Sequence, residues 1–164
     1  MKRLIWTFLL ICFAVAGISA LDEGDKAAPF ANMDLNGNFV FSSNFIGSEW
    51  VLIDFFATWC KPCKEELPVL ESIFSEYKDK GLSGFIFGTD EEGASKLSPF
   101  FSDNPTSMTV LLDPYMVAAE RYGVEGLPAV FLVNPEGNIV LRGDGFSEET
   151  IERIKTILSE NLNE

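Results

Sequence analysis

The chain has 164 residues, enough for one domain with a substantial core and too few for two. Hydrophobic residues make up 47% and charged residues 23%, which excludes a disordered chain. The formal net charge of −13 argues against nucleic acid as a partner, because phosphate contacts need clustered Lys and Arg. The absence of histidine excludes a histidine base, a histidine metal ligand and a Ser-His-Asp triad.

The first segment, residues 1–20, has the composition of a secretory signal peptide. Lys2 and Arg3 precede an apolar run, and the segment ends in small residues at Ala20, where we expect cleavage. The run is slightly long for a signal and short for a spanning helix, which needs about 20 residues. An uncleaved membrane anchor through residues 4–20 is therefore the alternative.

Cleavage would leave a mature domain, residues 21–164, with 10 basic and 25 acidic residues and a net charge of −15. This domain keeps Cys60 and Cys63, and an exported chain works where disulfides persist. Cys12 follows Ile11, where a lipoprotein signal would have a small residue, so we expect no lipidation. The sequence thus predicts an exported protein, periplasmic or otherwise extracytoplasmic.

Apolar runs bounded by turn signals predict the strands. Asn36-Gly37 lies between apolar flanks and predicts a small N-terminal hairpin. The run WVLIDFFA, residues 50–57, is nearly continuous, as in a strand buried on both faces. The other predicted strands span 82–90, 108–113 and a hairpin at 128–143 around the turn NPEG.

Helical spacing of apolar residues predicts helices between and after these strands. The predicted helices span 61–80, 91–104, 114–123 and 147–162. Gly81 is a stop signal for the first, and the second is expected to have an acidic first turn. Pro114 and Gly123 are expected to begin and end the third. Ser147 is the predicted N-cap of the last.

Strands that alternate with helices, followed by a hairpin and a final helix, predict an α/β sandwich around a central mixed β-sheet. Chemistry on such sheets lies beyond the carboxyl ends of the parallel strands. Cys60 follows the strand 50–57 at the start of a helix, so the cysteine pair is the candidate site.

Several uses of two cysteines at this spacing fail on the remaining sequence. Zinc and iron–sulfur sites need more ligands than two thiolates in a chain without histidine. Haem attachment needs a histidine at position 64, which is Lys64. A structural disulfide closing two residues would gain little, because its benefit grows with loop length.

Redox chemistry gives the spacing a physical reason. A helix N-terminus stabilises a thiolate, so we expect the pKa of Cys60 to be low, with Lys61 adding to the effect. Cys63 lies one turn later on the same face and can displace a partner captured by Cys60. Pro62 fits the first helical turn at little cost. Cys60 is thus the predicted attacking thiol and Cys63 the resolving thiol.

The segment WCKPC after a buried strand, Pro68 five residues after the second cysteine and the later run GLPAVFLV resemble the thioredoxin superfamily. The order of elements and the run VLLDPYMVAAERYGVEGLPAVFLVNPEGNIV are similar to the exported TlpA/ResA-like thiol-disulfide oxidoreductases. The resemblance implies a thioredoxin-like fold with an N-terminal β-hairpin extension and no cofactor or metal.

The resemblance also assigns further site residues. Pro128 matches the family's cis-proline, and the backbone of Leu127 would pair with a substrate strand. Asp54 matches the buried acid of cytoplasmic thioredoxins, whereas Glu66 matches an acid of the ResA-like branch. Having both acids departs from either branch. Trp59 is expected to shield the thiol and shape the substrate surface.

The resulting hypothesis is a protein-disulfide reductase acting on exported proteins or apocytochromes. Its expected partners are disulfide-containing proteins and, by analogy, a membrane thiol-electron donor, and we expect a monomer. A peroxiredoxin-like peroxidase is an alternative, although Ala57 stands where such sites place Thr, and Thr58 comes one residue late. A Cu(I)-binding chaperone of this fold is another, although related chaperones contribute a histidine. The acidic run 90–92 is interpreted as a solvated helix start.

Overall fold

The computed structural model describes residues 20–162, so the predicted leader lies, except for Ala20, outside the described residues. The core is one five-stranded sheet in the order β5-β4-β3-β6-β7. Its strands are β3 (Trp50–Phe56), β4 (Leu82–Gly88), β5 (Thr109–Leu112), β6 (Ala129–Val133) and β7 (Ile139–Asp144). The first three run parallel, whereas β6 and β7 are antiparallel to their neighbours, so the sheet is mixed as expected.

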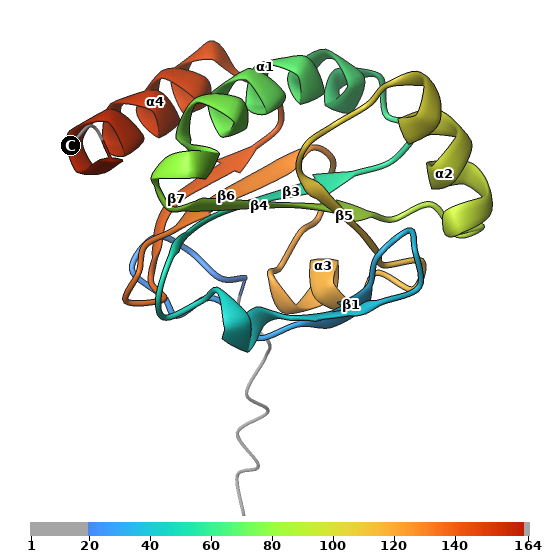
Figure 1. Cartoon of the computed structure of the whole chain (residues 1–164), viewed down its shortest axis with the longest axis horizontal. Helices are drawn as coiled ribbons and strands as arrows, with labels where there is room; N and C mark the ends of the chain where they lie inside the picture. Colours follow the sequence, from blue (N-terminus) through green and yellow to red (C-terminus); the bar gives the residue numbers. More distant parts are fainter. Residues whose placement is uncertain (1–19, 163–164) are drawn as a thin grey trace, which may run out of the picture.

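Helices cover both faces of this sheet (Figure 1). One face carries α1 (Lys61–Tyr77), α2 (Ala94–Asp103) and α4 (Glu148–Leu162). The other carries α3 (Val117–Arg121) and a separate hairpin of β1 (Ala31–Met33) and β2 (Phe39–Phe41). Short 3₁₀ turns, Ser42–Asn44 and Lys78–Lys80, follow β2 and α1. The predicted thioredoxin-like architecture and its N-terminal hairpin are therefore confirmed.

Strand β3 lies in the middle of the sheet, and every one of its residues is buried. Alternate side chains point to opposite faces, so Leu52 and Phe56 join the core beneath α1, whereas Ile53 and Phe55 join the core above α3. The nearly continuous apolar run in the sequence reflects this burial on both sides. Asp54 shares the face of Leu52 and Phe56 and is the exception in the run.

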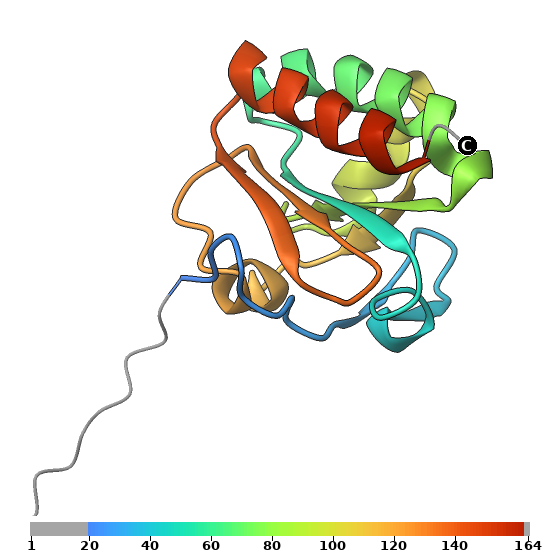
Figure 2. The same cartoon turned by 90° about the vertical axis from the view of Figure 1, so that its left-hand side faces the viewer.

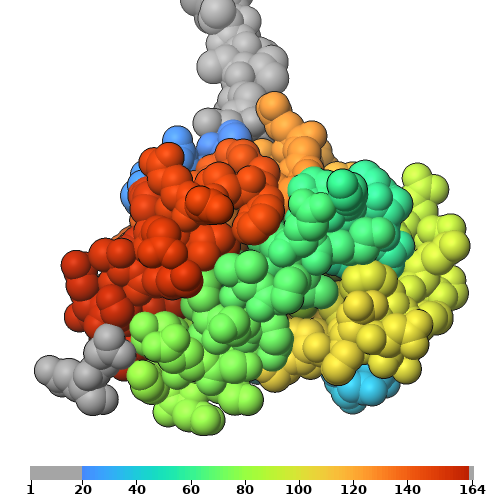
Figure 3. All heavy atoms as spheres, turned by 90° about the horizontal axis from the view of Figure 1, so that it is seen from above, coloured from blue at the N-terminus to red at the C-terminus, as the bar shows by residue number. Residues whose placement is uncertain are grey.

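Helix α1 crosses the sheet beside α4, as Figures 2 and 3 show from two directions. Its buried side chains fall on one stripe that includes Leu67, Leu70 and Phe74. The helix gives way to a 3₁₀ turn before Gly81, whose φ of 102° is the left-handed conformation expected of a helix stop. Because α1 begins at Lys61, shortly after β3 ends at Phe56, the N-terminus of the helix lies at the carboxyl end of β3.

Two predicted helix starts are wrong. Helix α2 begins at Ala94 after a turn closed by the Gly93 N–H and the Asp90 carbonyl oxygen at 2.8 Å, so it has no acidic first turn. Helix α3 begins at Val117 rather than Pro114, because Met116 has a left-handed φ of 54° and interrupts the helical backbone. In both cases the residues before the helix form a turn, although the spacing of their apolar side chains would also fit a helix.

The segment that precedes the hairpin is bound to the edge strand β7. The backbone of Lys26 forms an antiparallel β-bridge with Asn138, the residue before β7. The Arg142 guanidinium donates to the Leu21 carbonyl oxygen at 2.6 Å. Ser147 caps α4 as predicted, accepting the Thr150 N–H at 3.1 Å. Between residues 20 and 162, none of the helices has the length and apolar character needed to cross a bilayer.

Candidate active site

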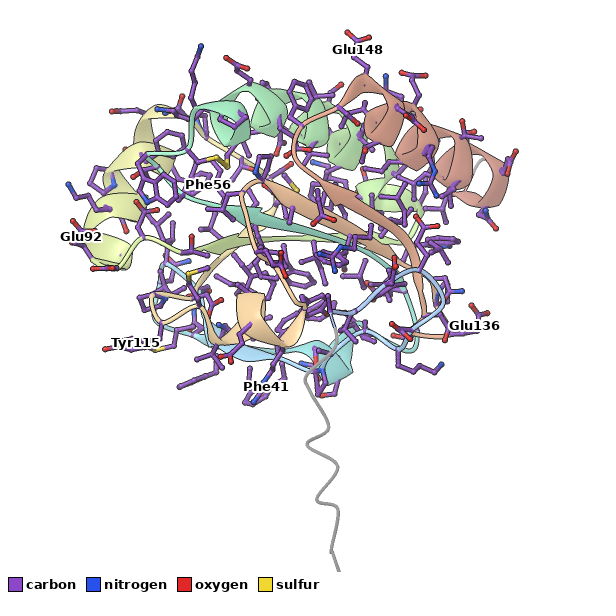
Figure 4. The ribbon with its side chains drawn as sticks, turned by 180° about the vertical axis from the view of Figure 1, so that it is seen from behind. Phe41, Phe56, Glu92, Tyr115, Glu136 and Glu148 are labelled. Carbon is purple, nitrogen blue, oxygen red and sulfur yellow. A yellow bond between two sulfur atoms is a disulfide. The ribbon has the colours of Figure 1, made fainter. Side chains whose placement is uncertain are left out.

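The two cysteines lie where β3 leads into α1. Cys60 is the N-cap of α1, and its sulfur accepts the Cys63 N–H at 3.2 Å. The two sulfurs form a disulfide, with the Cα atoms 5.3 Å apart (Figure 4). Pro62 occupies the first turn, where a missing N–H costs nothing. In this oxidised form Cys60 is only 4% exposed and Cys63 1%.

The loop before Cys60 is fixed by hydrogen bonds to Asp90, a buried residue that follows the neighbouring strand β4. Asp90 follows β4, is 2% exposed, and accepts the Thr58 N–H at 2.9 Å and the Thr58 hydroxyl in a short hydrogen bond. The prediction that the run 90–92 is simply solvated is therefore wrong for its first residue. Composition could not separate Asp90 from Glu91 and Glu92, which are exposed.

Two buried carboxyl groups lie between the sheet and α1, on the face of the sheet that α1 covers. Asp54 is fully buried in β3, and Glu66 is 1% exposed on the same α1 stripe as Cys63. None of their four carboxyl oxygens has a hydrogen-bond partner within residues 20–162. Ionising such groups is costly, so both favour the protonated form.

The two acids titrate differently. Burial raises the pKa of Glu66 to about 7. Burial raises the pKa of Asp54 well above its ordinary value, and the Glu66 charge raises it further. A charge on Glu66 opposes ionisation of Asp54, so the pair resists carrying two charges at once. Glu66, with its pKa of about 7, can exchange a proton near neutral pH.

The neighbouring Glu65 shows why the sequence left the role of Glu66 open. Glu65 is exposed and lies 3.6 Å from the Lys61 ammonium, whereas Glu66 points into the core. Lys61 itself is 85% exposed in its side chain. Only the orientation of the helix decides which of two adjacent glutamates is buried.

The remaining predicted residues surround the disulfide. The Leu127–Pro128 peptide bond is cis, and Pro128 is buried at the start of β6. Leu127 packs against the hydrophobic cluster that contains both cysteines. Trp59 is 71% exposed, and together with Leu127 it lines a surface cavity. The predicted residues from three segments, β3, the start of α1 and the loop before β6, thus lie at one end of the sheet.

A thioredoxin-like sheet with a disulfide at a helix N-terminus is the arrangement of a thiol-disulfide oxidoreductase. The AhpC/TSA family matches residues 23–142 of the chain. The thiol-disulfide oxidoreductase ResA of Bacillus subtilis (strain 168) is 32% identical over 127 residues, or 76% of this chain and 69% of the relative. ResA of Bacillus thuringiensis subsp. konkukian is 29% identical over 139 residues, or 84% and 79%.

Solved structures agree with these relatives. A crystal structure described as a thiol:disulfide interchange protein DsbE from Chlorobium tepidum has a TM-score of 0.79 and 32% identity, covering 87% of this chain and 99% of that one. The thioredoxin domain of a thiol-disulfide oxidoreductase from Bacteroides vulgatus has a TM-score of 0.74 and 27% identity, covering 84% and 99%. The chain belongs to the AhpC/TSA family and is a thiol-disulfide oxidoreductase of the ResA type.

Proposed function

We propose that this oxidoreductase reduces disulfides of exported proteins, apocytochromes among them, outside the cytoplasm. The observation that supports the proposal most strongly is the Cys60–Cys63 disulfide at the N-terminus of α1, with a buried acid of raised pKa on the same helix stripe. The residues between the cysteines are Lys61 and Pro62. They lack the histidine that strongly oxidising members of the superfamily carry there, which favours reduction.

The first step is attack by Cys60. In the reduced protein its thiolate is stabilised by the Cys63 N–H, which already points at its sulfur, and by the helix N-terminus. A bond forms between the Cys60 sulfur and one substrate sulfur, the substrate disulfide breaks, and the leaving thiolate takes up a proton.

The second step is release by Cys63. Its sulfur attacks Cys60, so the intramolecular disulfide forms and the mixed disulfide breaks, and the second substrate thiol leaves with the electron pair. Cys63 must lose its proton for this attack, yet it is 1% exposed. An internal acceptor is therefore needed, and Glu66 is the acid on the same helix stripe with a pKa of about 7. Asp54 holds the proton that keeps the pair from carrying two charges.

Substrate would bind across the loop before β6. The backbone ahead of Pro128, where Gly126 is exposed and Leu127 half-buried, can pair with an extended substrate segment, and Trp59 covers the approach to Cys60. The enzyme would act as a monomer and recover its electrons from a membrane thiol donor, an assignment made by analogy alone. Residues 1–20 would export the domain 21–164 or tether it to the membrane through residues 4–20.

Insulin reduction by the pre-reduced mature domain tests the proposal. We expect sustained turnover with a reductant, and single capture without turnover for Cys63→Ala, because a mixed disulfide at Cys60 then has no resolving thiol. An undiminished steady rate in that variant would contradict the two-thiol cycle. Peroxide consumption and Cu(I) retention, measured in parallel, test the peroxidase and chaperone alternatives. Trapping with the same variant would identify natural substrates.

A further inference from the structure

A cavity of about 650 Å³ opens on the surface near the active site. Trp59, the residue before Cys60, and Leu127, before the cis-proline, both line it, so an occupant would contact residues that flank the disulfide. The segment from Pro114 to Met116 forms another wall. Figure 4 shows Tyr115 and Glu92 at the end of the molecule that carries the disulfide.

The apolar side chains of this cavity are unusually exposed. Trp59 is 71% exposed, Tyr115 87% and Met116 43%. Large apolar groups gathered at one exposed site are characteristic of binding surfaces. Aromatic rings and a flexible methionine are suited to bind varied side chains, which a reductase of several proteins requires.

The backbone at this wall is held in an uncommon conformation. Met116 is the only non-glycine residue with a positive φ among residues 20–162. The Asp113 carboxylate fixes the segment by accepting the Ala118 and Ala119 N–H groups at 3.1 and 2.9 Å, and the Asp113 carbonyl accepts the Met116 N–H at 2.9 Å. Strain of this kind concentrates at functional sites.

The polar lining of the cavity is acidic. Glu91, Glu92 and Glu125 line it, and the described lining residues include no lysine or arginine. All three glutamates are exposed. The Glu92 carboxylate lies 3.9 Å from the Lys96 ammonium, so its charge is partly offset. Two further carboxylates therefore face an occupant, in a protein whose net charge is already −13.

We propose that this cavity binds a segment of the disulfide-bearing substrate that combines an aromatic or aliphatic side chain with a lysine or arginine close to the reacting cysteine. The inference rests on the proposed reductase function and adds a substrate preference to it. Apolar side chains would rest on Trp59 and Tyr115, and the cation would lie among the glutamates. A second copy of this acidic chain is a poor occupant, because like charges would meet.

The test compares two peptides with one disulfide and one tryptophan each, differing only in two lysines or two glutamates beside the cysteine. Second-order rate constants for oxidation of the reduced protein are measured at low and high salt. We expect the lysine peptide to react about tenfold faster at low salt, with the difference shrinking as salt rises. Equal rates, or a faster glutamate peptide, would overturn the inference.

Charge-matched variants locate the effect. The triple variant Glu91→Gln/Glu92→Gln/Glu125→Gln should lose most of the preference for the lysine peptide. The control Glu76→Gln/Glu136→Gln/Glu160→Gln changes the net charge equally at exposed sites outside the cavity lining and should keep it. Equal losses in both triples would show general steering by net charge and would contradict a specific site.

The apolar wall is tested by Tyr115→Ala, whose side chain is too exposed to be needed for folding. We expect a raised KM for the lysine peptide with little change in kcat, since the tyrosine acts in binding. An unchanged KM would remove the aromatic part of the inference. A concentration-dependent dimer abolished by Tyr115→Ala would identify a second copy as the occupant and overturn the proposal. Failure of the wild type to reduce a small uncharged disulfide would instead refute the reductase function itself.

Discussion

At the scale of single residues, the two buried carboxyl groups make stability depend on pH. The folded protein raises the pKa of Glu66 from 4.5 to about 7, so the native state binds this proton more tightly than the unfolded state. Between these two values the native state holds more protons, and the free energy of unfolding therefore falls as pH rises. The loss is complete only well above pH 7, once the native carboxyl is fully ionised, and it amounts to roughly 3 kcal/mol at most.

Replacing Glu66 by glutamine should remove this loss. We expect the stability difference between Glu66→Gln and the wild type, both oxidised, to increase by up to roughly 3 kcal/mol in favour of the variant from pH 4.5 to pH 8. Urea unfolding at several pH values measures it. Glu65→Gln, at the exposed neighbouring position, is the matched control for the change of charge. The same pH dependence in both variants would contradict a raised pKa at Glu66.

Asp90 positions Cys60 indirectly, through its two hydrogen bonds to Thr58 in the loop before that cysteine. Asp90→Asn keeps an oxygen acceptor but loses the charge that strengthens both bonds to Thr58, so we expect a loss of about 1–3 kcal/mol in stability. A looser Cys60 should also lower the rate of disulfide reduction, by up to about tenfold. Thr58→Val removes only the hydroxyl bond and should have a smaller effect. Normal stability and rate in Asp90→Asn would exclude this role.

Among the secondary-structure elements, the sequence predicts those whose residues follow a long periodic pattern. The stripe of α1 and the buried run of β3 each extend over several residues, so their positions follow from spacing alone. The beginnings of α2 and α3 could not be predicted, because they depend on Gly93 and Met116 taking positive φ. The burial of Asp90 depends on strand β4 lying beside β3, a contact between distant segments.

Packing between β4 and α2 gives a prediction at this scale. A Cβ atom on Gly88 would clash with the two methyl carbons of Leu97, so Gly88→Ala must shift this fully buried side chain of α2. We expect a loss of about 1–3 kcal/mol in thermal or urea unfolding. Combining it with Leu97→Ala should cost less than the sum of the two single changes, because the clash is then relieved. Gly126→Ala, where a Cβ meets no atom within 4 Å, is the control and should leave stability nearly unchanged.

For the whole molecule, the absence of histidine makes the titration of the buried acids easier to observe. A chain without histidine has few groups that titrate near neutral pH, so proton exchange there reports largely on the active site. The sequence revealed both candidate acids through their positions relative to the cysteines. It could not show that both are buried without partners, because that depends on how α1 lies on β3.

The titration curve of the entire oxidised protein should therefore show the site directly. Disulfide formation removes the thiols of Cys60 and Cys63 from the titration, and Cys12 and the amino terminus contribute equally to all the proteins compared. The Glu66 proton is counted in proteins that also carry Asp54→Asn, because the Glu66 charge raises the pKa of Asp54 and Glu66→Gln alone would shift that second titration. In this background we expect the protein with Glu66 to release about one proton more than the protein with Glu66→Gln between pH 5 and 9, centred at about 7. Potentiometric difference titration of Asp54→Asn and Asp54→Asn/Glu66→Gln measures this proton. Identical curves for these two proteins would mean that Glu66 does not ionise near neutral pH, and Cys63 would then lack the internal base assigned to it.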